Sequence, residues 1–415
     1  MALNLKLTEK QPLTLTNRLK LTLVFVLFTL LSANSFAHTD SISHESSHEK
    51  TTTDTSAAQD HNDHTEATHE DHKPKFDAGE MIIHHISDAH EIHFFTLNEG
   101  KENEKHASIY LPVIIKNESG FHVFNASHFY HNKKDITVNG KHMHYYEHDG
   151  FIMFEEKIYE AGDTHPVFFD SEGKITNASV LDLSPTKSVV GMFITILLLV
   201  LLFGSAARKY KSNPNKAPSG LQGFLEPLVL FLRDEVIIPA MGPKHATRFM
   251  PFLLTTFFFI WFANILGMIP FIGGFNIMGT LGVTIVLATI VFIKTTLNGK
   301  AYYWTHIFWP HGVPLPIKFI LVPIEIISIF MKPLVLMIRL TANMTAGHII
   351  FMALTALIFI FGQQSAVAGY SIGIGSAAFM VFMYFIELLV AFLQAYVFTL
   401  LAASYFGSAL EEPHH

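Results

Sequence analysis

Two apolar tracts near the C-terminus are much longer than a membrane helix needs to be. They cover about residues 317–361 and 370–409. A helix rises about 1.5 Å per residue, so a tract of some 40 residues is about 60 Å long, roughly twice the hydrocarbon thickness of a bilayer. Each tract must therefore break or lie steeply inclined in the membrane. Pro323 and Pro333 permit bends in the first tract, whereas long inclined helices suit a protein that curves along a larger membrane object.

Three shorter apolar segments precede these tracts, which predicts about five membrane-embedded helices. They cover residues 189–207, 249–271 and 275–293, and a mixed segment at 221–241 has the spacing of a helix at the cytoplasmic interface. Only 15% of the residues are charged, against about a quarter in a soluble domain. Residues 186–415 are therefore predicted to form an α-helical membrane domain, with the last two helices as a long inclined hairpin. By the positive-inside rule, basic residues mark the cytoplasmic side of the membrane. Arg208, Lys209, Lys211 and Lys216 follow the first span, and Lys294, Lys300 and Lys318 mark the same side again. Counting five passes from there places the C-terminus in the cytoplasm.

The start of the chain is predicted to direct export. In residues 1–37, basic residues precede an apolar run that is too short to span a bilayer, and Ala37 suits a signal-peptidase site. An uncleaved anchor is the alternative, and either one exports the segment that follows. Residues 38–75 are mostly His, Asp, Glu, Ser and Thr, a composition that predicts disorder. Four histidines there could bind a divalent metal such as zinc: His61, His64, His69 and His72. They are irregularly spaced and form no closed ligand set. A solvated tail is therefore favoured, and no metal or cofactor is predicted.

Residues 76–185 are predicted to form a small β-rich periplasmic domain. Short β-type runs occur at residues 93–97, 108–115, 121–124, 136–138 and 151–154, separated by turn signals at 117–120, 139–140 and 149–150. The domain has no catalytic constellation, and its histidines fit surface or hydrogen-bonded strand positions better than ligands. The absence of Cys excludes disulfides, thiolate metal sites and cysteine nucleophiles. The net charge of −7 argues against a nucleic-acid partner.

Several polar side chains lie within the two long tracts, where each is energetically costly. At about 100° per residue, one face of the first tract, about 60° wide, carries Glu325, Ser328, Lys332, Arg339, Asn343 and Ala346, and His348 falls on the opposite face. In the second tract Glu387, Gln394 and Tyr405 share one face.

Pairing the tracts as an antiparallel hairpin aligns two polar pairs. The residue numbers of Arg339 and Gln394 sum to 733, and those of His348 and Glu387 sum to 735. Both sums place the turn near residue 367, inside the turn-like segment 362–369. The hairpin is thus predicted to contain two polar environments, one around Arg339 and one around His348 and Glu387 nearer the external turn.

Structural roles would explain several of these side chains equally well. Lys332 can extend its amine to the interface, Glu325 and Ser328 can be packing residues, and Asn343 and Gln394 can be interhelical hydrogen-bond partners. Arg339 is harder to explain in that way, because a central Arg costs about 2.5–3.5 kcal/mol on insertion scales and no acidic residue is near it in the sequence. A functional role is predicted for Arg339, with its partner on another chain.

Segment 332–347 resembles the signature of subunit a of F-type ATP synthases. Its core, Arg-Leu-x-x-Asn-Met-x-Ala-Gly, begins at Arg339. Segment 387–398 is similar to the last helix of that family, which carries a polar residue seven positions before a Gln, and segment 264–270 resembles a weaker family motif. The resemblance covers roughly residues 185–410, and upstream of the arginine it includes Glu325, Ser328, Lys332 and Pro333.

The resemblance implies a proton-translocating stator subunit that is not itself catalytic. Arg339 would face the carboxylates of the c-type rotor ring, Asn343 and Gln394 would flank that contact, and His348 and Glu387 would line the external half-channel. Many bacterial members exchange Glu and His at the last two positions, and the order here is similar to that of mitochondrial members. The implied partners are the rotor ring, the peripheral-stalk subunit b, the other ATP synthase subunits and the lipid of a bacterial inner membrane.

The exported extension departs from the common pattern of that family. Two other functions therefore stay open at this point. One is a stand-alone ion-coupled transporter with a periplasmic metal-binding domain, and the other is an envelope interaction protein that the helices only anchor.

Overall fold

The computed structural model describes residues 79, 82–83, 86–97, 105–138, 141–162, 165–170, 174–212, 216–269, 274–310 and 312–411. The predicted signal peptide (1–37) and the His-rich segment (38–75), with His61, His64, His69 and His72, lie outside the described residues. So does the predicted turn at 139–140.

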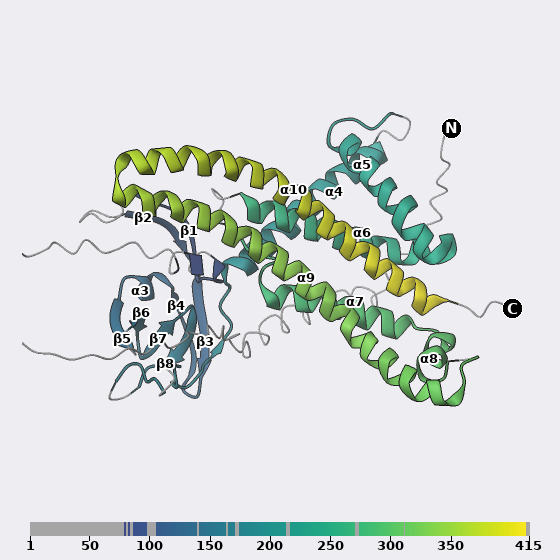
Figure 1. Cartoon of the computed structure of the whole chain (residues 1–415), viewed down its shortest axis with the longest axis horizontal. Helices are drawn as coiled ribbons and strands as arrows, with labels where there is room; N and C mark the ends of the chain where they lie inside the picture. The colour runs from purple at the N-terminus through teal and green to yellow at the C-terminus, as the bar shows by residue number, and fades with distance from the viewer. Residues whose placement is uncertain are drawn as a thin grey trace, which may run out of the picture.

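A β-rich domain precedes the helices, as predicted (Figure 1). Two strands pair as a hairpin, β1 (Glu91–Leu97) with β2 (Lys105–Tyr110). A second sheet places β3 (Pro112–Asn117) between β4 (Gly120–Asn125) and β9 (Leu181–Asp182). A third, antiparallel sheet follows chain order through β5 (Lys133–Val138), β6 (Lys141–His148), β7 (Phe151–Phe154) and β8 (Lys157–Glu160). A short helix, α3 (Ser127–Tyr130), lies between β4 and β5 in the chain.

The strand predicted at 108–115 is in fact two strands, because Leu111 leaves the ladder between them. Its N–H donates to the carbonyl of His90, and its own carbonyl accepts from the N–H of Ala126. The prediction also missed β6, β8 and β9, of which β6 is rich in His and Tyr and has no apolar alternation. Strand β3 does alternate, and its inward side chains Val113 and Ile115 are fully buried with Phe129 and Met153 in one core.

Five helical segments are long and apolar enough to cross a membrane: α4 (Lys187–Ser212), Leu221–Met268, α7 (Leu281–Asn298), α9 (Leu315–Gln364) and Val367–Leu410 within α10 (Ala366–Leu410). The second joins α5 (Leu221–Phe231), the π-helical turn η2 (Leu232–Ile237) and α6 (Ile238–Met268). The predicted interfacial helix therefore continues into the next span, and the chain changes direction at Gly242, whose φ of 73° is the left-handed region that glycine permits.

Two details between α6 and α9 differ from the prediction. Helix α7 begins at Leu281 rather than at residue 275, because the N–H of Thr280 donates to the carbonyl of Asn276 in a preceding turn. A short helix, α8 (Ala301–Phe308), was not predicted.

The last two helices form the predicted hairpin. Helix α9 is uninterrupted through Pro323 and Pro333, so this tract does not break. Ser365, with φ −161°, separates it from α10 and caps the first turn of α10 by accepting from the N–H of Ala368 at 3.1 Å. The turn thus falls inside the predicted segment 362–369.

Side-chain contacts confirm the predicted register of the hairpin. The rings of Phe351 and Tyr384 have centroids 5.7 Å apart, and Thr355 Oγ1 lies 3.8 Å from Met380 Sδ. Both pairs of residue numbers sum to 735, the value predicted for His348 and Glu387.

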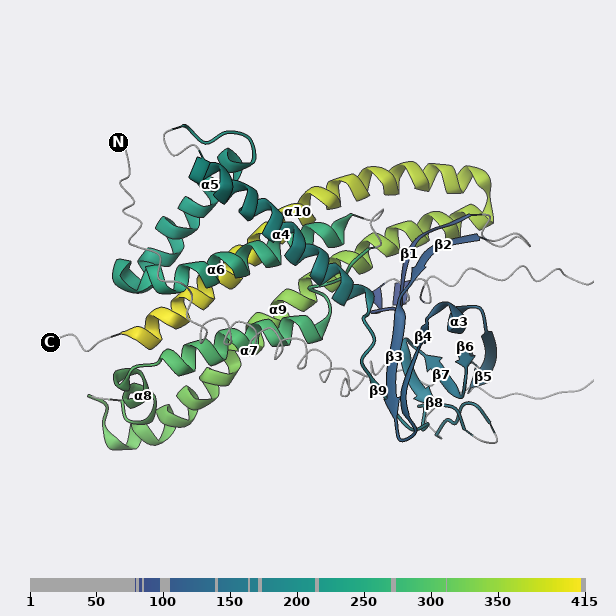
Figure 2. The same cartoon turned by 180° about the vertical axis from the view of Figure 1, so that it is seen from behind.

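Two helices cross the hairpin and hold it. The Thr284 and Thr341 hydroxyls hydrogen-bond at 2.7 Å and join α7 to α9, and the buried Asn264 amide donates to the Ala391 carbonyl at 3.5 Å and joins α6 to α10. Figures 1 and 2 show the α9–α10 turn at the same end of the molecule as the β-rich domain, with the C-terminus at the opposite end.

Candidate functional site

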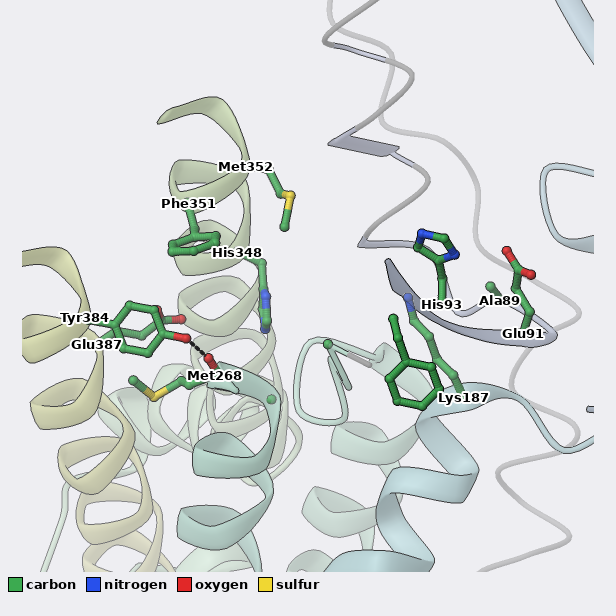
Figure 3. Close-up of a pocket in the computed structure, with 13 residues that line it drawn as sticks. Ala89, Glu91, His93, Lys187, Met268, His348, Phe351, Met352, Tyr384 and Glu387 are labelled. Carbon is green, nitrogen blue, oxygen red and sulfur yellow. Dashed lines mark hydrogen bonds between the residues drawn. The ribbon is translucent and has the colours of Figure 1, made fainter. Parts of the chain in front are cut away.

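His348 and Glu387 line one cavity of about 150 Å³ (Figure 3). Helix α9 contributes His348, Phe351 and Met352 to its wall, and α10 contributes Tyr384 and Glu387. The spacings of three and four residues place the side chains of each helix on one face. The structure therefore brings together the two residues that the hairpin register had paired.

The end of α6 closes the inner side of this cavity. The Tyr384 hydroxyl donates to the carbonyl of Met268, where α6 ends (Figure 3). A β-carbon on Gly267 would lie 2.5 Å from the carbonyl oxygen of Phe275 and 3.6 Å from His348 Nε2. Glycine is therefore required at 267 for the chain to approach both groups.

Arg339 lies in a different environment from His348. It is half-buried, it does not line the His348 cavity, and its guanidinium is close enough to the Tyr405 hydroxyl to interact electrostatically. The Lys332 amine lies 5.5 Å from the centroid of the same tyrosine ring. Among the described residues, Arg339 forms no salt bridge with a carboxylate. The chain thus holds two polar environments apart, and the cationic one lacks an acid of its own in the described part.

The structure does not join the other two predicted site residues to Arg339. Asn343 is exposed on α9, one turn beyond Arg339, whereas Gln394 on α10 is buried with 8% of its surface exposed. Within the described ranges no hydrogen bond links Arg339 to Gln394. The Asn264–Ala391 hydrogen bond fixes α10 between Glu387 and Gln394.

Part of the cavity wall comes from the β-rich domain, which the sequence analysis had kept separate from the membrane helices. The N-terminal side of the cavity consists of Ala89, Glu91, His93, Phe94 and Lys187, and Figure 3 labels all of these except Phe94. Periodicity within β1 or α4 carries no signal for this contact, because it arises from the docking of one domain on another. Tyr384 could have been found, since it lies on the Glu387 face of α10 and opposite Phe351 in the predicted register.

The outer surface of the hairpin is strongly apolar. Phe319, Ile320, Phe385 and Leu389 are each more than 65% exposed. Exposed apolar side chains of this kind fit lipid or a membrane-embedded partner. In the described residues, no cluster of three or more His, Asp or Glu side chains could hold a metal ion.

Family models match both halves of the chain. A family model described as ATP synthase A chain matches residues 189–407, and a model described as a domain of unknown function (DUF8433) matches residues 81–183. The chain is 38% identical over 268 residues to ATP synthase subunit a of Chloroherpeton thalassium, an alignment covering 63% of this chain and 78% of the relative.

Two further relatives carry the same name. The chain is 41% identical over 240 residues to ATP synthase subunit a of Myxococcus xanthus, covering 57% of this chain and 76% of that protein. It is 36% identical over 270 residues to ATP synthase subunit a of an Anaeromyxobacter species, covering 61% of this chain and 63% of that relative's length.

Proposed function

The chain belongs to the ATP synthase A chain family, and from that premise we propose that it is the proton-translocating stator subunit of a rotary ATP synthase. In this role it is non-catalytic and forms two half-channels separated by Arg339. Its partners are the c-type rotor ring, the peripheral-stalk subunit b and the remaining ATP synthase subunits.

Arg339 is the observation that carries this proposal. A guanidinium stays protonated at any cellular pH, so it attracts a deprotonated carboxylate without itself passing a proton. Arg339 is half-buried on α9 and has no carboxylate partner in the described part of the chain. A rotor carboxylate supplied by the neighbouring ring would complete the pair, and protons would then cross only by travelling on the rotor. Each charge that moves through 100 mV yields about 2.3 kcal/mol.

His348 and Glu387 are proposed to relay protons in the external half-channel. An imidazole and a carboxyl group can both accept and release protons under physiological conditions, and the two residues share one cavity. Asn343 and Gln394 are proposed to flank the contact between Arg339 and the rotor.

We further propose that the chain resides in a bacterial inner membrane with the β-rich domain in the periplasm and the C-terminus in the cytoplasm. The cluster of Arg208, Lys209 and Lys211 at the end of α4 supports this orientation by the positive-inside rule. The α9–α10 turn, and the His348 cavity near it, would then face the periplasm.

The test is coupled ATP synthesis in membrane vesicles that contain the complete assembly. Arg339→Ala is expected to abolish proton-driven synthesis, and Arg339→Lys is expected to do the same because an ammonium lacks the planar guanidinium geometry. Arg208→Ala, at an exposed position on α4, is the matched control and should retain synthesis. Coupled synthesis that survives Arg339→Ala would contradict the assignment. A stand-alone transporter would instead move ions as the purified chain, without a rotor ring.

A further inference from the structure

The cavity that contains His348 and Glu387 has a second wall, built by the β-rich domain. Strand β1 and the residues just before it contribute Ala89, Glu91, His93 and Phe94, and the first residue of α4 contributes Lys187. Figure 3 shows Ala89, Glu91, His93 and Lys187 across the cavity from His348. The exported domain is therefore part of the site rather than a separate appendage.

The geometry of β1 explains why so many of its residues reach the cavity. Side chains alternate along a strand, so Glu91 and His93 point to one face. A β-bulge between His93 and Phe95 inserts Phe94 as an extra residue in the pairing with β2, and a bulge redirects the side chain next to it. Adjacent residues His93 and Phe94 can thus both face the cavity.

Several hydrogen bonds fix this wall to the membrane helices. The N–H of Lys187 donates to the carbonyl of Ala89 at 3.0 Å, and the N–H of Ser188 donates to Asp88 Oδ1 at 2.9 Å. The Ser188 and Thr280 hydroxyls lie 2.8 Å apart, which connects α4 to the residue that precedes α7. The position of β1 is therefore set by α4 and not by the β-sheets alone.

Glu91 carries chemistry suited to proton exchange. It is buried, with 8% of its surface exposed, and it lines the cavity. Burial, together with the nearby Glu156 carboxylate, raises its pKa to about 7, although the Ser108 hydroxyl and the Lys187 ammonium act in the opposite direction. A carboxyl group with that pKa exchanges protons readily near neutral pH. His93 contacts the same Ser108 hydroxyl as Glu91, because its Nδ1 lies 2.9 Å from Ser108 Oγ.

We propose that the exported domain forms the outer section of the external half-channel, in which Glu91, assisted by His93, passes protons through cavity water to His348 and Glu387. The cavity is polar on both sides and roomy enough for several water molecules. The proton taken up by Glu91 from the periplasm is released to that water, and the Glu91 carboxylate is regenerated for the next transfer. This inference rests on the proposed function, because it extends the same proton path outward.

The first experiment measures proton-driven ATP synthesis in vesicles containing the complete assembly, at external pH values from acid to alkaline. Glu91→Gln keeps the size of the side chain but removes its titration, and Glu118→Gln, at the exposed turn between β3 and β4, is the matched control. We expect Glu91→Gln to lower proton flux about tenfold near and above neutral external pH. This is less than the full effect of a positioned acid–base group, because His348 and Glu387 can still receive protons directly from water. The loss should shrink at acid pH, where hydronium is abundant. Other titratable groups stay unchanged in this variant. Those near Glu91 or in the same cavity are His93, Tyr110, Tyr130, Glu156, Lys187, His348, Tyr384 and Glu387.

A second experiment tests the wall itself and does not depend on flux. Because the chain has no Cys, His93→Cys with Met352→Cys provides one pair of thiols across the cavity, and a short bifunctional thiol reagent should join them in the intact assembly. Val123→Cys, on the exposed face of β4, paired with Met352→Cys is the control and should not be joined.

The outcomes separate the inference from the proposed function. The inference is overturned if Glu91→Gln shows wild-type flux at every external pH. It is also overturned if positions 93 and 352 are not joined although the thiol at each position, introduced alone, reacts with the reagent. If Arg339→Ala still abolishes coupled synthesis in that case, the stator assignment stands and only the outer section is wrong. If Arg339→Ala leaves synthesis intact, the proposed function itself fails, and the outer section fails with it.

Discussion

Gly347 leaves open the space that the Glu387 carboxylate occupies: a β-carbon added at position 347 would lie 2.6 Å from Glu387 Oε1. Real β-carbons essentially never approach an atom so closely. The glycine that ends the Arg339 signature on α9 therefore sets where the carboxyl group on α10 can lie.

Gly347→Ala is expected to fold, because the atom in its way is the end of a flexible side chain, but to turn the Glu387 carboxylate out of its present position. Displacing a relay group by about 1 Å can reduce a rate by about 10²-fold. Proton flux in vesicles should fall accordingly while the amount of assembled complex stays constant. Gly375→Ala on α10, where a β-carbon meets nothing within 4 Å, should leave flux unchanged. Equal flux in both variants would show that the position of Glu387 does not matter.

The His348→Ala, Glu387→Ala double variant is expected to slow proton flux, since it removes the imidazole and the carboxyl group that the hairpin contributes to the cavity. An acid-pulse measurement on vesicles checks this. The control is the pair Thr355→Ala and Met380→Ala, which lies in the same register nearer the turn and carries no titratable group. Unchanged flux in the double variant would remove the relay role of the pair.

The folding of the β-rich domain is expected to weaken as the pH rises from about 6.5 to about 9. Burial alone lowers the pKa of His90, but the hydrogen bond of its Nε2 to the Asp182 carboxylate and the nearby Glu156 carboxylate outweigh burial and raise the pKa from 6.5 to about 9. A histidine whose pKa is raised in the folded state contributes its full stabilisation at pH values below its unfolded-state pKa of 6.5. That contribution is lost as the pH rises through its folded-state pKa. Glu91, whose pKa is raised from 4.5 to about 7, adds a loss in the same direction at lower pH.

Limited proteolysis of the full chain between residues 105 and 182 measures this effect. His90→Gln removes the titration, so the ratio of the cleavage rates of variant and wild type should fall between pH 6.5 and pH 9, because only the wild type then loses the contribution of His90. That ratio also cancels the pH dependence of the protease. A ratio that is constant with pH would mean that His90 titrates equally in the folded and unfolded states.

Gly407→Ala is expected to destabilise the packing of α10 on α6. A β-carbon there would lie 2.0 Å from the backbone oxygen of Ala240, which cannot turn aside as a side chain can. Overpacking of this kind costs about 1–3 kcal/mol, which thermal unfolding in detergent can measure. Gly204→Ala on α4 meets nothing within 4 Å and should be neutral or slightly stabilising. Equal unfolding temperatures for the two variants would contradict the close contact.

Local pattern in the sequence determined the hairpin and its polar pair. The length of the two apolar tracts, the turn at 362–369 and helical periodicity are properties of neighbouring residues, and an antiparallel hairpin has a single free parameter, its register. Two polar pairs with nearly equal residue sums were enough to set that parameter. His348 and Glu387 could therefore be paired before any tertiary contact was known. The strands of the β-rich domain were found only where short runs of apolar β-type residues occur, so β6, with its His and Tyr residues, was missed.

Only the tertiary structure decided that Glu91 and His93 share a cavity with His348 and Glu387. These residues are separated by more than half of the chain, and what brings them together is the docking of β1 on α4 through Ala89, Asp88 and Ser188. The periodicity of a strand states which side chains share a face but not what that face meets. The free energy that selects the partner comes from hydrogen bonds and packing between distant segments, and these contacts exist only once the chain has folded.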